Sequence, residues 1–196
     1  GFYPNSAAGN SGGASVCYGT TTAGKYIATA NSSTQSACTT GNYCPATTVY
    51  YGKSGANGGG LNACSAPYSQ SAASSDDAND CYLTTSPKKY VKSVGAGEVS
   101  CLAGNYCGGG SIIYRGGTVS GRATTGGSAV CSANSYCPEA VSEPIACSTL
   151  GGGLYKNSSA GSDAATDCYF TTTGGYYLAN ATDTTQTKCE AKFYCP

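Results

Sequence analysis

Residues 68–82 read YSQSAASSDDANDCY, residues 155–169 read YKNSSAGSDAATDCY, and the two stretches align without a gap. Residues 1–18, GFYPNSAAGNSGGASVCY, align to residues 153–169 with one inserted residue. We call these three stretches the serine blocks. A block repeated at this scale is typical of repeat proteins, in which small units of one kind follow each other along the chain. The repeat therefore predicts a tandem array of small modules rather than one large enzyme domain.

A second shared segment begins at the last cysteine of each serine block. Cys17 begins CYGTTTAGKYI, Cys81 begins CYLTTSPKKYV and Cys168 begins CYFTTTGGYYL, so that a tyrosine stands nine residues after each cysteine. Further along comes a cysteine pair with five intervening residues, and one more such pair stands inside an insertion. We call these pairs the cysteine loops: CTTGNYC at 38–44, CLAGNYC at 101–107, CSANSYC at 131–137 and CEAKFYC at 189–195.

The spacing of these segments predicts four parts. They are a partial first repeat with a linker at 1–63, a second repeat at 64–107, an insertion at 108–146 and a third repeat at 147–196. Cys64 and Cys147 precede the second and third serine blocks, whereas no cysteine precedes the first. We therefore expect the missing cysteine to lie upstream, in a longer repeat array.

The composition limits the kind of core that can form. The chain has 13 Cys, 29 Gly, no His, Trp or Met, and 10 acidic against 10 basic residues. Burial of apolar surface contributes about 25 cal/mol per Å² and must offset roughly 1–2 kcal/mol of backbone entropy per ordered residue. Cross-links can supply the difference, since a disulfide that closes a loop of about 15–25 residues stabilises the folded state by roughly 3 kcal/mol. We expect a small disulfide-rich fold dominated by β-strands and turns, an elongated tandem array of short-stranded modules with essentially no helix.

The cysteine spacing favours disulfides over metal. Structural zinc sites usually have about two to four residues between paired ligands and often use histidine; every close pair here has five, and histidine is absent. We therefore expect no cofactor. Disulfides persist in oxidising compartments, which predicts a secreted, extracellular or cell-surface protein. Neither membrane insertion nor nucleic-acid binding is expected, because no long apolar run occurs and the charges are balanced and scattered.

Two disulfide pairings fit the repeats. The preferred pairing joins the cysteine before the second and the third serine block to the cysteine near the end of that block, and it closes each cysteine loop on itself: Cys64–Cys81, Cys147–Cys168, Cys38–Cys44, Cys101–Cys107, Cys131–Cys137 and Cys189–Cys195. It leaves Cys17 unpaired or bonded between subunits. The alternative moves each bond along by one cysteine: Cys17–Cys38, Cys44–Cys64, Cys81–Cys101, Cys107–Cys131, Cys137–Cys147 and Cys168–Cys189, which leaves Cys195. The sequence does not separate the two.

Short strands and tyrosines are expected to build the modules. Four segments combine β-branched and aromatic residues between turn formers and are predicted to contain strands: 47–52, 88–94, 111–116 and 175–181. With 17 Tyr against 3 Phe, tyrosine must supply most of the packing. The tyrosine before the last cysteine of each cysteine loop is therefore predicted to be a core residue: Tyr43, Tyr106, Tyr136 and Tyr194.

Few residues suggest a catalytic, metal-binding or modification site. Without histidine there is no ordinary Ser/His or Cys/His nucleophile pair, so an enzyme is not expected. Calcium could bind the carboxylates at residues 76–80, but a solvated turn is favoured because the first serine block has no acid before Cys17. Three sequons are possible N-glycosylation sites, at Asn31, Asn157 and Asn180.

The stretches CTTGNYCP and CLAGNYC, and the segment from Cys64 to Cys81, resemble the cysteine-rich repeats of the ephrin-receptor-like and tumour necrosis factor receptor-like type. This resemblance implies elongated extracellular rods of stacked disulfide modules, as found in receptors, adhesins and large surface proteins. The family usually places two cysteines close together between modules, whereas this chain has a single cysteine followed by tyrosine at 17, 81 and 168. No binding residue is carried over.

Two functions are consistent with these features. The first is an extracellular structural protein, a unit of a disulfide-stabilised filament, stalk or surface coat that self-associates or continues a longer repeat chain. The alternative is an adhesin or receptor-like recognition ectodomain that binds a glycan or a protein. In that case Tyr114 and Arg115, in the irregular insertion, are the residues expected to bind the ligand.

Overall fold

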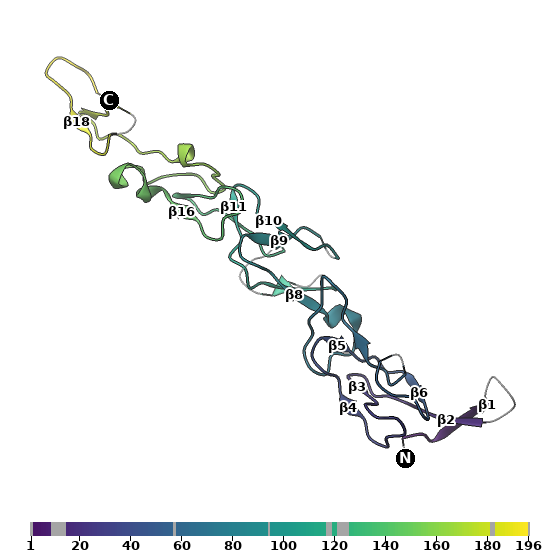
Figure 1. The fold of residues 1–196 in the computed structure, drawn as a ribbon. Coiled ribbons are helices and arrows are strands. Elements are labelled where there is room, and N and C mark those ends of the chain that lie inside the picture. The colour runs from purple at the N-terminus through teal and green to yellow at the C-terminus, as the bar shows by residue number, and fades with distance from the viewer. Residues whose placement is uncertain are drawn as a thin grey trace. The chain divides into compact units, whose positions relative to one another are not determined.

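The computed structural model describes residues 2–8, 15–56, 58–93, 95–116, 119–120, 126–180 and 183–195. Their regular structure consists of short antiparallel strands and four 3₁₀ turns of three residues each (Figure 1). Each of the four predicted strand segments contains a strand; the last residues of two of them, Val94 and Ala181, lie outside the described residues. The expectation of a disulfide-rich, strand-and-turn fold made of small tandem modules is confirmed.

The chain divides into two compact units. One comprises Gly1–Thr84, Ser93–Gly97 and Ile112–Ser120, and the other comprises Thr85–Lys92, Glu98–Ser111 and Gly121–Pro196.

The first unit has two three-stranded sheets and two strand pairs. One sheet has the order β1-β2-β6, formed by Asn5–Ala8, Ser15–Thr20 and Thr48–Tyr50. The other has the order β13-β12-β8, formed by Val119–Ser120, Ile112–Tyr114 and Tyr82–Thr84. The pairs are β3 (Lys25–Tyr26) with β4 (Ser36–Ala37), and β5 (Asn42–Tyr43) with β7 (Asn62–Ala63). The 3₁₀ turn η1 spans Ala78–Asp80.

The second unit contains four strand pairs. They are β9 (Lys89–Val91) with β10 (Glu98–Ser100), β11 (Asn105–Tyr106) with β14 (Ala129–Val130), β15 (Ser135–Tyr136) with β16 (Ile145–Ala146), and β17 (Tyr176–Tyr177) with β18 (Thr187–Lys188). Its 3₁₀ turns are η2 (Cys147–Thr149), η3 (Gly151–Gly153) and η4 (Ala165–Asp167).

Six disulfides cross-link the modules. They join Cys38–Cys44, Cys64–Cys81, Cys101–Cys107, Cys131–Cys137, Cys147–Cys168 and Cys189–Cys195. These are the bonds of the preferred pairing, and the described residues contain none of the shifted bonds. Cys17 is unpaired and exposed.

The cystines take much of the place of an apolar core. The six cysteines of the first three cysteine loops are at most 1% exposed. Among the larger aliphatic side chains, Ile27 and Val49 are completely buried. In the second unit Tyr90 is buried against the Cys101–Cys107 disulfide. Because large apolar residues are scarce, each module is organised around a disulfide and the turns that contact it.

Candidate functional site

One kind of turn recurs throughout the chain, and it organises the contacts between modules. It consists of a residue with φ between 68° and 84°, followed two positions later by a tyrosine. We call it the tyrosine turn. Among the described residues, seven have both this φ and a tyrosine two positions later: Gly24, Gly41, Lys88, Gly104, Asn134, Gly175 and Lys192. Glycine suits the position because it has no Cβ to oppose a positive φ.

A cysteine loop binds four of these turns by one pair of backbone hydrogen bonds. The Cys38 N–H donates to the Gly24 carbonyl, and the Gly24 N–H donates to the Cys44 carbonyl, both at 2.8 Å. The same two bonds, at 2.7–3.1 Å, join Lys88 to loop 101–107, Gly104 to loop 131–137 and Gly175 to loop 189–195. Each loop thus binds the turn that precedes it.

A serine block and the cysteine before it bind the turns at Gly41 and Asn134. The Cys64 N–H donates to the Gly41 carbonyl and the Cys147 N–H to the Asn134 carbonyl, both at 3.0 Å. In return the turn N–H donates to a serine carbonyl: Gly41 to Ser71 at 3.3 Å, and Asn134 to Ser158 at 3.0 Å.

The same two serines add a side-chain bond. The Ser71 hydroxyl donates to the Asn42 carbonyl, and the Ser158 hydroxyl donates to the Ser135 carbonyl, both at 2.6 Å. Ser71 is 3% exposed and Ser158 is 5% exposed. Equivalent serines of two serine blocks therefore make equivalent buried contacts with the residue after the turn.

Two further backbone hydrogen bonds join each of the first three cysteine loops to a segment later in the chain, and we call the side that this segment covers the outer side of the loop. In the first loop the Ser74 N–H donates to the Cys38 carbonyl and the Cys44 N–H donates to the Ser75 carbonyl, both at 2.9 Å. The segment 140–141 makes the same two bonds with loop 101–107, and the segment 161–162 makes them with loop 131–137. A following segment therefore covers each of these loops, which explains why their cysteines are inaccessible.

The fourth cysteine loop, 189–195, lacks this outer contact. Among the described residues no strand pairs with Phe193 and Tyr194, and no hydrogen bond reaches the backbone N–H or carbonyl of Lys192 or the N–H of Cys195. Phe193 is 73% exposed and Tyr194 is 88% exposed. The prediction that Tyr194 is a core residue is therefore wrong for this structure, because no described segment packs over it. Its counterparts Tyr43, Tyr106 and Tyr136 are half-buried.

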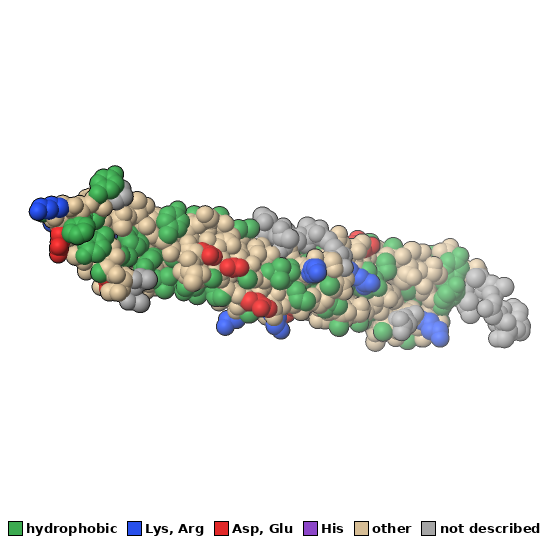
Figure 2. All heavy atoms as spheres, turned by 90° about the horizontal axis from the view of Figure 1, so that it is seen from above, with side chains coloured by type: hydrophobic (Ala, Val, Ile, Leu, Met, Phe, Trp, Pro, Cys, Tyr) green, Lys and Arg blue, Asp and Glu red, His purple; other side chains and the backbone are tan. Residues whose placement is uncertain are grey.

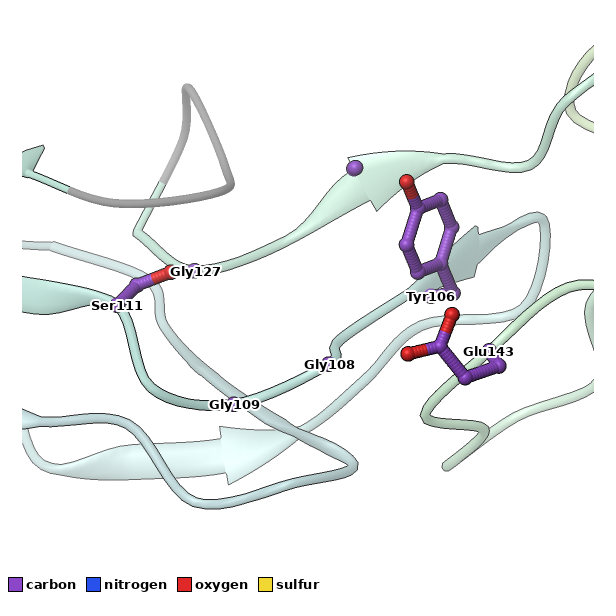
Figure 3. Close-up of a pocket in the computed structure, with 7 residues that line it drawn as sticks. Tyr106, Gly108, Gly109, Ser111, Gly127 and Glu143 are labelled. Atoms are coloured by element: carbon purple, nitrogen blue, oxygen red, sulfur yellow. The ribbon is translucent and has the colours of Figure 1, made fainter.

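A separate cavity of about 300 Å³ lies in the second unit (Figure 3). Its lining comes mainly from the predicted insertion and consists of Tyr106, Gly108, Gly109, Ser111, Gly127, Ala129 and Glu143. The Glu143 carboxylate lies beside the Tyr106 side chain, and the Ser111 hydroxyl points toward Gly127. Ser111 is 1% exposed, and its Oγ has no hydrogen-bond partner among the described residues.

The structure places the predicted recognition residues at the end of β12. Tyr114 is half-buried, and its ring centroid lies 5.5 Å from that of Tyr82 on the neighbouring strand β8. Arg115 is exposed, and its backbone N–H donates to the Cys81 carbonyl at 2.7 Å. These two residues belong to the first unit, whereas the cavity belongs to the second. Their role in recognition stays a prediction.

The sequon asparagines differ in exposure. Asn31 and Asn180 are exposed, whereas Asn157 is half-buried and its backbone exchanges two hydrogen bonds with Tyr169. The other two residues of the third sequon, 181–182, lie outside the described residues. Glycosylation at these positions stays a prediction.

The acidic residues of the serine blocks have a local structural role. The Asp80 carboxylate accepts hydrogen bonds from the N–H groups of Asp76 and Asp77, at 3.0 and 3.1 Å. Asp167 does the same for residues 163 and 164, at 2.9 and 3.1 Å. These carboxylates cap the 3₁₀ turns η1 and η4, which accounts for an acid at this position.

Comparison of the chain with protein-family models, with curated proteins and with solved structures found no match. Within the described residues no helix is long and apolar enough to cross a membrane.

Proposed function

We propose that this chain is a structural repeat protein of the cell exterior, a unit of a disulfide-stabilised filament, stalk or surface coat. One observation carries the proposal: the same backbone contact between a tyrosine turn and a cysteine-led segment occurs six times. In repeat proteins of this kind each module is stabilised by its neighbours, so the array grows by repeating one contact. The earlier resemblance to receptor-like extracellular repeats agrees with such a module.

The chemistry of the chain supports this proposal. Six disulfides in 196 residues suggest an oxidising environment, and the proposal places that environment outside the cell. On the face drawn in Figure 2, charged side chains occur singly or in small groups among polar and hydrophobic ones. A surface of mixed character suits a protein that packs against copies of itself better than one that binds a highly charged polymer.

A recognition ectodomain is the second candidate, and the cavity in the second unit favours it. A tyrosine ring, a carboxylate and a buried hydroxyl are groups that can orient a sugar or a peptide. For this candidate, Glu143→Ala should weaken binding to an immobilised glycan panel in a variant whose melting curve shows that it still folds. Equal binding by Glu143→Ala and the wild type would count against the cavity as the site.

Electron microscopy of native material, with thiols blocked at lysis, tests the structural proposal. Fibres or coats with a constant repeat distance, weakened by reducing agent, are the expected result. Isolated particles that show no self-association would contradict the proposal and favour the recognition ectodomain.

A further inference from the structure

The part of the second unit that lines the cavity has a structural counterpart in the first unit. The Thr85 N–H donates to the Ser111 carbonyl, and the Ser111 N–H donates to the Thr85 hydroxyl oxygen, at 2.8 and 3.0 Å. Thr21 and Thr47 make the same two bonds at the same two distances. Ser111 therefore occupies the position that Thr47 has in the first unit, and the residues around the two can be compared.

Several cavity residues are smaller than their counterparts. Ala129 lies opposite Tyr106 on the neighbouring strand. Its counterpart Asn62 lies opposite Tyr43 in the same way. The residues at 108–110 are all glycine, whereas only a proline and an alanine stand at this place in the first unit. The cavity therefore lies where the chain has small side chains on a backbone frame that it also uses in the first unit.

The Ser111 hydroxyl is a polar group that the fold itself does not use. It is 1% exposed, its Oγ has no hydrogen-bond partner among the described residues, and it points toward Gly127, another residue of the cavity lining. A buried hydroxyl without a partner destabilises the folded chain, and native structures contain few such groups. A polar ligand in the cavity supplies the missing partner.

The lining of the cavity defines the chemistry of this ligand. Figure 3 shows Ser111 on one side, and Tyr106 with Glu143 on the opposite side. Of the described lining residues only Glu143 is charged, and an unpaired buried charge is costly, so the ligand is neutral beside Ser111. On the opposite side the carboxylate accepts hydrogen bonds and repels anions, while the tyrosine ring offers an apolar face. The volume of about 300 Å³ lies at the lower end of ligand pockets, which suits a ligand of monosaccharide size.

We propose that this cavity binds a single neutral sugar residue, either free or at the end of a glycan chain. The Ser111 hydroxyl donates to one sugar hydroxyl, and the Glu143 carboxylate accepts a hydrogen bond from another. The Tyr106 ring packs against the apolar face of the sugar. The inference rests on the second candidate function, recognition, and names its ligand class; it holds equally for a chain that also assembles into a filament or coat.

Ligand-observed NMR titration of the full chain tests the proposal. The probes are glucose, galactose, mannose and N-acetylglucosamine, each as the free sugar and as a disaccharide with that sugar at its non-reducing end. Ser111→Ala removes the buried hydroxyl. Ala129→Asn fills the cavity with the side chain that the first unit carries as Asn62, so the variant should fold. Val130→Asn is the matched control, because Val130 is the next residue of the same strand, is 63% exposed and is not among the described lining residues.

The wild type and Val130→Asn should bind at least one of these sugars, and Ala129→Asn should bind none. Ser111→Ala should raise the Kd by a factor of about 2–12, which corresponds to the loss of one net hydrogen bond. Without sugar this variant should melt at the same temperature as the wild type or higher, because the hydroxyl has no partner to lose. Tighter binding of the disaccharide identifies the end of a glycan as the ligand, and equal or weaker binding identifies the free sugar.

Three results would overturn the inference. The first is a wild type that binds none of the sugars, as expected if the cavity holds only water. The second is equal affinity of Ala129→Asn and the wild type. The third is a Ser111→Ala variant with unchanged affinity and a lower melting temperature, which would give the hydroxyl a structural role. None of these results decides the structural proposal, which the imaging of native material tests separately.

Discussion

Replacing Ser158 by alanine tests whether the serine blocks hold the cysteine loops by the contacts described. The variant loses the 2.6 Å hydrogen bond from the Ser158 hydroxyl to the Ser135 carbonyl. Ser158 is 5% exposed, so water replaces this donor poorly. A net hydrogen bond is worth roughly 0.5–1.5 kcal/mol, and a buried group left unpaired costs about 1–3 kcal/mol. Because Ser135 is half-buried, we expect a loss of about 1–2 kcal/mol.

Amide hydrogen exchange measures this loss locally. A loss of about 1–2 kcal/mol increases the open population by a factor of about 5–30. The affected amides are those of Asn134, Cys137 and Gly161, whose hydrogen bonds join cysteine loop 131–137 to the serine block. Their exchange should accelerate by that factor, whereas the amides of the first cysteine loop should be unchanged.

Two further variants make the test specific. Ser159→Ala is the matched control, because Ser159 is the next residue and its side chain is exposed. Ser71→Ala should accelerate exchange at Gly41 and Cys44 instead, because Ser71 makes the equivalent bond in the first unit. Unchanged exchange in Ser158→Ala, or equal acceleration in Ser159→Ala, would refute the reasoning.

Three further predictions concern stability. Gly104→Ala should lower the melting temperature, since φ is +77° and a Cβ would lie 2.7 Å from a carbonyl oxygen. The left-handed backbone alone costs a residue with a Cβ about 1–2 kcal/mol. Gly97→Ala is the control and should have little effect, because its Cβ would meet open space. Replacing both Cys64 and Cys81 by serine should cost about 3 kcal/mol in denaturant titration, because their bond closes a 17-residue separation; an unchanged midpoint would contradict the cross-link. Tyr3→Phe should be neutral or stabilising by about 1 kcal/mol, because the Tyr3 hydroxyl is buried without a partner among the described residues. Burial, and secondarily Tyr51, raises the pKa of Tyr3 above 10.0, so the folded state favours the neutral phenol. This preference stabilises the folded state below pH 10, and the stabilisation is lost as the pH rises through the raised pKa. Tyr3→Phe has no hydroxyl to ionise and should therefore unfold at a higher pH than the wild type.

Repeat alignment was enough to propose the bonds present in the structure, as the preferred one of two pairings. Cys64 precedes one serine block and Cys81 is the last cysteine of that block. Cys147 and Cys168 have the same positions in another copy, so equivalence between copies suggested equivalent bonds. The strand segments could be predicted because β-branched and aromatic residues stand between turn formers. Neither argument needed a contact between distant residues.

The tyrosine turns could not be recognised in the same way. Tyr26, Tyr90 and Tyr177 stand nine residues after a cysteine, whereas the other four tyrosines lie in the cysteine loops. All seven nevertheless stand two positions after a residue of positive φ. Glycine marks four of the seven turns, but lysine or asparagine stands at the other three, which hides the pattern. The seven turns share their position relative to tyrosine, and comparing the residues two positions before each tyrosine identifies them as one group.

The contacts that the serine blocks make with the cysteine loops could not be predicted from the sequence either. Ser71 and Ser158 occupy equivalent positions in two serine blocks, but many other serines surround them. Their partners lie 29 and 23 residues away in the chain, and only the folded structure brings them together. For the same reason the exposure of Tyr194 was not foreseen, because it depends on a covering segment and not on the tyrosine itself.

Peptide mapping of native, unreduced protein, with free thiols alkylated before digestion, tests most directly the claim that self-closed cysteine loops organise the modules. We predict loop peptides two mass units lighter than their reduced forms, the bonds Cys64–Cys81 and Cys147–Cys168, and alkylation at Cys17. Alkylation at Cys195 together with a Cys17–Cys38 bond would show the shifted pairing and contradict the account.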